Sequence, residues 1–241
     1  MVLEEQKKKF QKEGYLVVPK LIDAKDVQYY SDLYNSFLNN SIDASRYRSD
    51  LSGSTEKTEK ITQIMVPSKL VPELLQRPIH RKSLQIAKEL MGEDIELDFD
   101  MLINKAPHTN TETPWHQDAA YWINMPDKRA ASCWVAIDRA HKENGCMWYT
   151  PKSHLLPLLP HAQTGSKGAL QCEGTEDNSV FIELEPGGCV FHQGGTLHYS
   201  RGNTTSENRR AFITNFRPKA MIELEREQGV DHTGEREIRT K

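Results

Sequence analysis

The sequence predicts a mainly β domain with N-terminal helices, built as an antiparallel sandwich or barrel. Apolar residues repeat with helical spacing in the first third of the chain, and the repeat changes to alternation after Gly92. Beyond that point, turn-forming residues separate short apolar segments, with no long helical pattern between them. Such a series of short strands is typical of antiparallel sandwiches and barrels.

The length and composition indicate one domain. The chain has 241 residues, of which 37% are hydrophobic, and this is enough for a sizeable core. No internal repeat, low-complexity tract or long Pro/Gly linker divides it. We therefore expect a single domain over residues 1–241, with a helical region of about 1–92 packed on a barrel core of about 93–218, followed by a tail at 219–241.

Charge and cysteine content indicate the partners and the compartment. The formal net charge is −3 with no long basic run, which disfavours a nucleic-acid partner. No segment has the roughly 18 apolar residues of a membrane span, and the charged N-terminus lacks the apolar core of a secretory signal. Four scattered cysteines fit reduced, buried thiols. We expect a cytoplasmic protein with a small-molecule substrate and no membrane partner.

Two helices are predicted in the first third. Asp23 is a suitable N-cap for the first, and Pro78 is a suitable first-turn residue for the second, which ends at Gly92. The first helix has apolar residues three or four apart, namely Val27, Tyr30, Tyr34, Phe37 and Leu38. The apolar residues of the second helix are Leu84, Ile86 and Leu90.

Residues 41–60 between these helices carry almost no apolar side chains. The simpler interpretation is a mobile surface loop, although long polar loops inside compact domains also serve as lids over active sites. Arg46 and Arg48 would be solvated in the first case and would contact an anionic substrate in the second.

After Gly92, the segment 95–103 alternates between the two faces of a half-buried strand. Turn sequences such as Asn144-Gly145 and Pro186-Gly187-Gly188 separate the later segments. These segments are predicted as strands at 132–137, 146–150, 179–184, 188–193 and 210–217.

His116 and Asp118 are the first candidates for metal ligands. Residues i and i+2 of a strand point to the same face, so these side chains can bind one divalent ion. A second histidine would complete the two-histidine, one-carboxylate triad of non-haem iron enzymes, which leaves positions open for a chelating co-substrate and O2. His192 lies inside an apolar strand, as core histidines do, whereas His198 follows Gly194 at the start of a new strand and is preferred.

Arg209 follows His198 by eleven residues, at the start of a predicted strand. 2-Oxoglutarate chelates a metal through one end and keeps a distal carboxylate at the other, and a buried guanidinium matches that carboxylate because it is planar and always charged. Ser200 offers a hydroxyl to the same group. Alternatively, Arg209 and Arg210 are solvated charges beside Glu207, which fits one arginine of the pair.

Several segments resemble the phytanoyl-CoA dioxygenase family. They occur in the family's order from about residue 10 to 218, nearly the whole chain. The segments are Phe10-x-x-Glu13-Gly14-Tyr15-Leu16-Val17-Val18-Pro19, Trp115-His116-Gln117-Asp118-Ala119-Ala120-Tyr121-Trp122, Glu143-Asn144-Gly145-Cys146-Met147, Pro151-Lys152-Ser153-His154 and His198-x-Ser200-x-x-Asn203 with Arg209. The resemblance implies a double-stranded β-helix, that is, a jelly-roll or cupin-like barrel.

The resemblance also implies roles for the matching residues. His116, Asp118 and His198 would be the ligands of Fe(II). Arg209 and Ser200 would hold the distal carboxylate of 2-oxoglutarate, which is the co-substrate together with O2.

Two further positions match residues that line the co-substrate pocket in relatives. These are Met101 on an early barrel strand and Trp134 after the His-x-Asp motif, and both would otherwise be ordinary core residues. Relatives that halogenate carry a small residue in place of the ligand carboxylate, so Asp118 argues against halogenation.

The sequence departs from the family's founding members, which act on acyl-CoA thioesters in peroxisomes. It shows neither a peroxisomal C-terminal signal nor a clear cluster for the CoA phosphates. A polar small molecule, such as an amino acid derivative or a natural-product intermediate, is preferred over a fatty acyl chain. The candidates for a substrate wall are Trp115, Tyr121, Trp122 and Asn124, and those for an anionic substrate group are His154 and Arg201.

The predicted function is hydroxylation of a small organic molecule, with release of succinate and CO2. The same chemistry gives desaturation, epoxidation or cyclisation when the substrate lies differently, and the sequence leaves these outcomes open. A metal-dependent cupin of another class, such as an isomerase, would not need Arg209 and Ser200. A non-catalytic protein that binds 2-oxoglutarate is a further alternative, which the intact triad disfavours.

Overall fold

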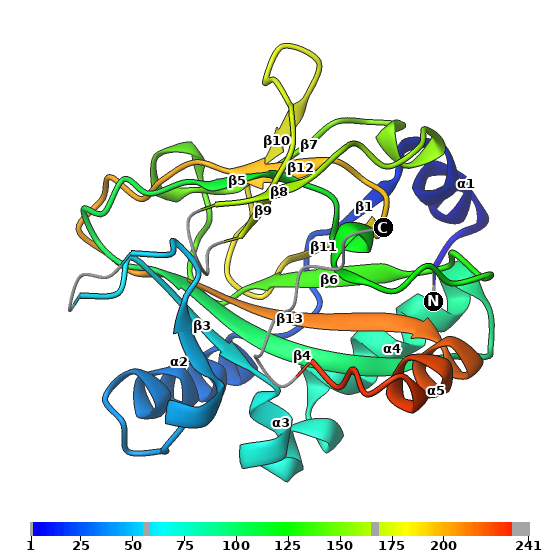
Figure 1. Cartoon of the computed structure of the whole chain (residues 1–241). Coiled ribbons are helices and arrows are strands. Elements are labelled where there is room, and N and C mark those ends of the chain that lie inside the picture. The colour runs from blue at the N-terminus through cyan, green and yellow to red at the C-terminus, as the bar shows by residue number, and fades with distance from the viewer. Residues whose placement is uncertain (1, 55–57, 165–168, 233–241) are drawn as a thin grey trace.

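Two β-sheets face each other across the middle of the molecule (Figure 1). The computed structural model describes residues 2–54, 58–164 and 169–232. Within these ranges, the strands of both sheets pair in antiparallel fashion. The predicted mainly β fold with helices on the N-terminal side is confirmed.

The larger sheet forms the floor of the barrel in the view of Figure 1. In spatial order it contains β1 (Tyr15–Val18), β11 (Cys189–Gln193), β6 (Ala131–Ala136), β13 (Arg209–Pro218), β4 (Ile95–Lys105), β3 (Ile61–Met65) and β2 (Arg48–Asp50). In the long β13–β4 pair, Arg209 lies opposite Lys105 and Asn215 lies opposite Phe99. This register fixes which residues share each end of the barrel.

The smaller sheet covers the larger one from above. In spatial order it contains β10 (Val180–Ile182), β7 (Met147–Tyr149), β12 (His198–Ser200) and β5 (Thr113–His116). The strands β8 (Ala162–Gln163) and β9 (Leu170–Gln171) form a separate pair. β12 pairs with β5 so that His198 lies opposite His116, which brings together residues that are far apart in the sequence.

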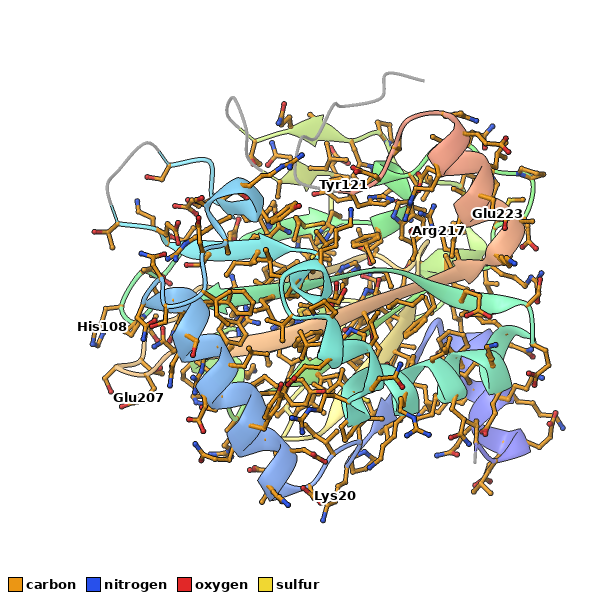
Figure 2. The ribbon with its side chains drawn as sticks, turned by 90° about the horizontal axis from the view of Figure 1, so that it is seen from below. Lys20, His108, Tyr121, Glu207, Arg217 and Glu223 are labelled. Carbon is orange, nitrogen blue, oxygen red and sulfur yellow. The ribbon has the colours of Figure 1, made fainter. Side chains whose placement is uncertain are left out.

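Helices pack on the outer face of the larger sheet (Figure 2). The α-helices are α1 (Glu4–Glu13), α2 (Ala24–Leu38), α3 (Pro67–Leu70), α4 (Pro78–Met91) and α5 (Lys219–Glu227). The backbone N–H of Asp26 donates to Asp23 Oδ1 at 2.9 Å, so the predicted cap of α2 is confirmed, and α4 begins at Pro78 and ends before Gly92 as predicted. No helix in the described ranges is long and apolar enough to span a bilayer.

The alternation of side chains along β6 divides the interior into two cores. Cys133 and Val135 pack towards the helices, whereas Trp134 and Ala136 pack towards the smaller sheet. Each large apolar side chain buried in either core contributes roughly 1.5–3 kcal/mol. The second core places Trp134 inside the barrel, where the sequence analysis expected a residue of the co-substrate pocket.

The N-terminal region differs from the purely helical region that we expected. It also contributes β1, β2 and β3 to the larger sheet. These strands were not predicted, because three to five residues give too few positions for alternation to show. Residues 41–60 contain a 3₁₀ turn and β2, and residues 55–57 of the expected lid lie outside the described residues. The expected tail contains α5, and its last residues, 233–241, also lie outside the described part.

Candidate active site

A cavity of about 590 Å³ lies between the two sheets. The strands supply most of its lining, and the turn after β5 adds Tyr121 and Trp122. Residues 228–232, which follow α5, complete the lining on another side. The volume is within the range that holds a drug-sized ligand.

Three candidate metal ligands converge on this cavity. His116 is the last residue of β5, His198 is the first residue of β12, and Asp118 begins the 3₁₀ turn Asp118–Tyr121. Asp118 Oδ1 lies 3.7 Å from His116 Nε2 and 3.6 Å from His198 Nε2. The ligand-type atoms of all three residues lie within 4.8 Å of one another. Two imidazoles and one carboxylate in this arrangement suit Fe(II) and leave positions open to other ligands.

Hydrogen bonds orient both histidines for metal binding. His116 Nδ1 lies 2.8 Å from the carbonyl oxygen of Pro114, and His198 Nδ1 lies 2.8 Å from that of Thr196. A carbonyl only accepts, so each Nδ1 carries the proton and each Nε2 is free to bind a metal. Burial lowers the pKa of both imidazoles, which keeps them in the neutral form that binds metals.

The second oxygen of Asp118 is occupied by the protein itself. Asp118 Oδ2 accepts hydrogen bonds from His192 Nε2, at 3.0 Å, and from the hydroxyl of Ser132. The hydroxyl of Tyr149 lies 3.3 Å from His192 Nδ1. Burial opposes ionisation of Asp118, but the histidines and these hydrogen bonds outweigh burial and lower its pKa, so it is a carboxylate. His192, the alternative ligand of the sequence analysis, thus lies behind Asp118, and Oδ1 faces the other two histidines.

Arg209 is a buried cation with unsatisfied donors. Its side chain is 1% exposed, and its Nε and Nη1 have no hydrogen-bond partner. Its guanidinium lies 5.1 Å from the centre of the Trp134 ring, and no ion pair to it occurs among the described residues. Burial lowers the pKa of Arg209 to about 10, so it remains charged at neutral pH. A buried, unpaired charge of this kind is costly unless an anion binds to it.

Arg210 shows the other possibility that the sequence left open. It points away from the cavity, and its Nη2 lies 2.7 Å from Asp138 Oδ1. Successive residues of a strand point to opposite faces, so one arginine of the pair is buried inside the barrel and the other is paired near the surface.

Arg209 and the candidate metal ligands lie towards opposite ends of the cavity. Arg209 and Asn215 are six residues apart on β13, which is roughly 20 Å at about 3.3 Å per residue. Ser132 pairs with Asn215 across the sheet and binds Asp118 through its side chain. Asp118 is therefore near the Asn215 end of this span, and Arg209 lies beyond Trp134, which pairs with Ile213.

The residues at the Arg209 end fit 2-oxoglutarate. Ser200, Met101 and Trp134 line the cavity with Arg209, as the resemblance implies. Gln63, which the sequence analysis did not single out, also lines it, and its side-chain nitrogen lies 3.4 Å from Met101 Sδ. Gln63 could have been found as a polar residue among the apolar residues of β3 (Ile61–Met65), but this strand was not predicted. A guanidinium, a hydroxyl and an amide at one end suit a carboxylate, and the metal ligands suit a chelating group at the other.

Among the predicted substrate contacts, Tyr121 and Trp122 line the cavity and the other four do not. Trp115 stacks on Tyr199 outside the barrel, with ring centres 4.3 Å apart. Arg201 Nε donates to Glu176 at 2.7 Å on the same outer face. The placement of these side chains does not support substrate contact.

His154 and Asn124 are also held away from the cavity. His154 Nε2 lies 2.9 Å from the carbonyl oxygen of Gln11, and the side-chain oxygen of Asn124 accepts from Lys128. In the expected lid, Arg48 Nε donates to Glu59 at 2.9 Å, and its guanidinium does not line the cavity. Arg46 does not line it either.

The sequence of this chain is similar to those of known proteins. The sequence matches the family described as phytanoyl-CoA dioxygenase (PhyH) over residues 10–211. It is 25% identical to the peroxisomal phytanoyl-CoA dioxygenase of Bos taurus over 227 residues, which cover 88% of this chain and 67% of the relative. It is 33% identical to phytanoyl-CoA dioxygenase domain-containing protein 1 of Rattus norvegicus over 120 residues, which cover 46% of this chain and 41% of the relative.

Solved structures share the fold. EvdO2 of Micromonospora carbonacea var. aurantiaca, in complex with 2-oxoglutarate, has a TM-score of 0.73 and 28% identity, covering 90% of this chain and 91% of EvdO2. EctD of S. alaskensis, with 2-oxoglutarate and 5-hydroxyectoine, has a TM-score of 0.71 and 18% identity, covering 91% of this chain and 77% of EctD, and shows the fold alone.

The chain therefore belongs to the phytanoyl-CoA dioxygenase family. The jelly-roll fold predicted from the resemblance is confirmed. The family consists of Fe(II)- and 2-oxoglutarate-dependent oxygenases, so the predicted oxygenase class and its co-reactants are confirmed for the family to which this chain belongs.

Proposed function

We propose that this family member hydroxylates a small organic molecule, with Fe(II) bound by His116, Asp118 and His198 and 2-oxoglutarate held by Arg209. One observation carries the proposal: the buried guanidinium of Arg209 has free donors and opens into the same cavity as the three ligand-type side chains. A cupin of another enzymatic class would have no use for an unpaired cation there.

Each part of the chain has a defined task in this function. The histidine Nε2 atoms and Asp118 Oδ1 would hold the iron, since carbonyl oxygens fix both rings and His192 holds Asp118 Oδ2. Iron held there would supply the oxidising chemistry, which consumes O2 and 2-oxoglutarate and yields succinate and CO2 with the oxidised substrate. The protein's own contribution is orientation and the exclusion of water.

At the co-substrate end, Arg209 neutralises the distal carboxylate and Ser200 donates a hydrogen bond to it. Trp134 and Met101 flank this carboxylate and keep water away from the pair, because both line the cavity beside Arg209. The structural neighbours SnoN and SnoK are described as an epimerase and a carbocyclase. Placement of the substrate, rather than a change in the iron site, would separate such outcomes from hydroxylation.

The proposal includes a cytoplasmic location. The four cysteines are unpaired, and three of them are buried, as in proteins of a reducing compartment.

The test is the affinity of the metal-loaded protein for 2-oxoglutarate, measured by calorimetry without oxygen. Arg209→Met should lower the affinity by a factor of roughly 30 or more, because it removes the buried partner of a carboxylate. Arg210→Met is the matched control and should leave the affinity within about twofold, since Arg210 pairs with Asp138 outside the cavity. Equal affinities in the two variants would remove Arg209 from the co-substrate site.

A further inference from the structure

Residues 228–232 form one wall of the cavity at the end away from Arg209. They line it together with Phe99, Trp122 and Ile123. Phe99 lies opposite Asn215 in the sheet, and Asn215 pairs with Ser132, which binds the metal-ligand candidate Asp118. This wall therefore lies beside the metal-ligand candidates and away from Arg209, where a substrate would bind next to the metal.

A buried ion-pair cluster fixes this wall in place. The guanidinium of Arg217 contacts the carboxylates of Asp98 on β4 and Glu225 on α5, and all three side chains are 0–1% exposed. His232 Nε2 lies 2.7 Å from Glu225 Oε2, and its ring stacks on Phe99 at 4.1 Å between ring centres. Figure 2 shows Arg217 on the inner side of α5, with Glu223 on the outer side.

The same guanidinium reaches the turn that follows the metal motif. Arg217 lies 5.1 Å from the centre of the Trp122 ring, and the backbone N–H of Ile123 donates to Glu225 at 3.4 Å. The wall after α5 and the wall after β5 are thus joined through one cluster. A change in the segment 228–232 acts on the cavity directly and does not touch Arg209.

The charges of the cavity define the kind of substrate. Among the described residues that line it, the one arginine or lysine is Arg209, and the co-substrate carboxylate uses that charge. Arg217 is paired with two carboxylates. No second arginine or lysine of the described lining is left for an anionic substrate, so the phosphates of an acyl-CoA thioester would meet no such side chain inside this cavity. The remaining lining combines apolar and aromatic side chains, such as Met65, Tyr121 and Trp122, with uncharged polar ones, such as Asn215 and Gln228.

The position of residues 228–232 in the sequence indicates a role in substrate specificity rather than in the chemistry that the family shares. The match to the family ends at residue 211, so both Arg217 and the segment 228–232 lie beyond it. The iron ligands and Arg209 lie within it.

We propose that residues 228–232, fixed by the Arg217 cluster, are the specificity-determining wall of the substrate site. The substrate is a neutral, ring-bearing small molecule that packs against Phe99, Tyr121 and Trp122. This inference rests on the proposed oxygenase function and deepens it.

The test is substrate-stimulated release of succinate from the iron-loaded full chain. The probes are neutral ring compounds (flavonoids, steroids and cyclic terpenoid alcohols) and palmitoyl-CoA. We expect a ring compound to raise succinate release above the level without substrate, and palmitoyl-CoA to have no effect. Val230→Trp should lower kcat/KM for that compound by roughly tenfold or more by filling the site. Leu156→Trp is the matched control, because Leu156 is 68% exposed and lies outside the cavity, and it should change kcat/KM less than about twofold.

Affinity for 2-oxoglutarate separates failure of this inference from failure of the oxygenase assignment. Both variants should bind 2-oxoglutarate like the unchanged protein, and Val230→Phe replaces Val230→Trp if the latter does not fold. Two results would overturn the proposed substrate class. One is that palmitoyl-CoA raises succinate release, and the other is that no probe raises it in a protein that binds 2-oxoglutarate. An unchanged kcat/KM in the Val230 variant would overturn the role of residues 228–232 as a wall of the substrate site. Absence of 2-oxoglutarate binding in the unchanged protein would instead contradict the proposed function.

Discussion

The clusters His116–Asp118–His198 and Asp98–Glu225–His232 look alike by distance, since in each the ligand-type atoms lie within 4.8 Å of one another. They differ in what surrounds those atoms. In the first cluster, the outer histidine nitrogens are bound by carbonyl oxygens, and the inner atoms face a cavity. In the second, the guanidinium of Arg217 contacts both carboxylates, and that of Arg226 contacts Asp98.

The difference shows that spacing alone does not define a metal site. A cation bound to the second cluster would have to displace two guanidinium groups from buried carboxylates. The first cluster has no competing cation among the described residues, so a metal meets no such cost there. The surroundings of the first cluster thus suit an exchangeable ion, whereas the second cluster holds three segments of the chain together.

The largest expected effect separates the clusters by metal binding. Asp118→Ala should weaken Co(II) or Mn(II) binding more than about 100-fold and abolish 2-oxoglutarate decarboxylation, because it removes an anionic ligand. Asp98→Asn should still bind one ion per chain with nearly unchanged affinity. Calorimetric titration of both variants measures this, and a second bound ion that disappears in Asp98→Asn would show that the two clusters are alike after all.

The next effect separates the clusters by stability. Arg217→Met should lower the free energy of unfolding by about 3–5 kcal/mol, because it leaves two buried carboxylates without their main partner. Arg139→Met is the matched control, since its partner Glu185 and Arg139 itself are both exposed, and it should cost less than about 1 kcal/mol. Urea unfolding gives both values. Equal stability of the two variants would mean that the Arg217 cluster does not fix the wall.

A smaller effect tests how the protein supports the proposed metal ligands. His192→Phe should weaken metal binding by about 10–100-fold, because Asp118 loses the hydrogen bond that holds Oδ2. His192→Gln keeps a donor and should recover part of the affinity. Full affinity in His192→Phe would reduce His192 to a core residue, and a loss as complete as that of Asp118→Ala would make it a ligand.

The smallest effect is the pH dependence of the second cluster. Burial acts to raise the pKa of Glu225, but hydrogen bonds from His232 and Arg217 outweigh burial and lower it to about 2. The unfolded chain, with a glutamate pKa of about 4.3, therefore binds more protons than the folded protein as the pH falls from about 5 towards 2. Stability is lost in that window. Glu225→Gln should lose less stability than the unchanged protein between pH 6 and pH 4.

Glu223→Gln is the control for this measurement, because Glu223 is exposed on the same helix. It should follow the unchanged protein at both pH values when unfolding by urea is compared. Identical pH dependence of Glu225→Gln and Glu223→Gln would contradict the role of Glu225.

The sequence predicts the elements whose signals are local and repeated. The alternation of 95–103 and the caps of α2 and α4 are of this kind. Three-residue and four-residue strands such as β2 and β1 carry no comparable signal, because their pairing depends on strands far away in the chain.

The sequence identified the residues at the metal and co-substrate positions of the cavity better than it identified the substrate contacts. The sequence predicted that His116 and Asp118 share a face because both lie on a strand, but β5 ends at His116 and Asp118 begins the following 3₁₀ turn. Alternation on a strand does separate Trp115 from His116 and Tyr199 from His198, which the predicted substrate contacts did not take into account. The wall at 228–232 could not be predicted, because it depends on the long-range contacts of Arg217. Its sequence, Gln228 to His232, looks like that of any exposed helix end.

The most direct test of the central assignment is an anaerobic titration of the metal-free protein with Fe(II) and 2-oxoglutarate. We expect a weak visible metal-to-ligand charge-transfer band, because 2-oxoglutarate would chelate an iron held by His116, Asp118 and His198. The band should be lost in His116→Ala. Iron-loaded protein that shows no band at saturating 2-oxoglutarate would contradict the assignment of the cavity as an iron and 2-oxoglutarate site.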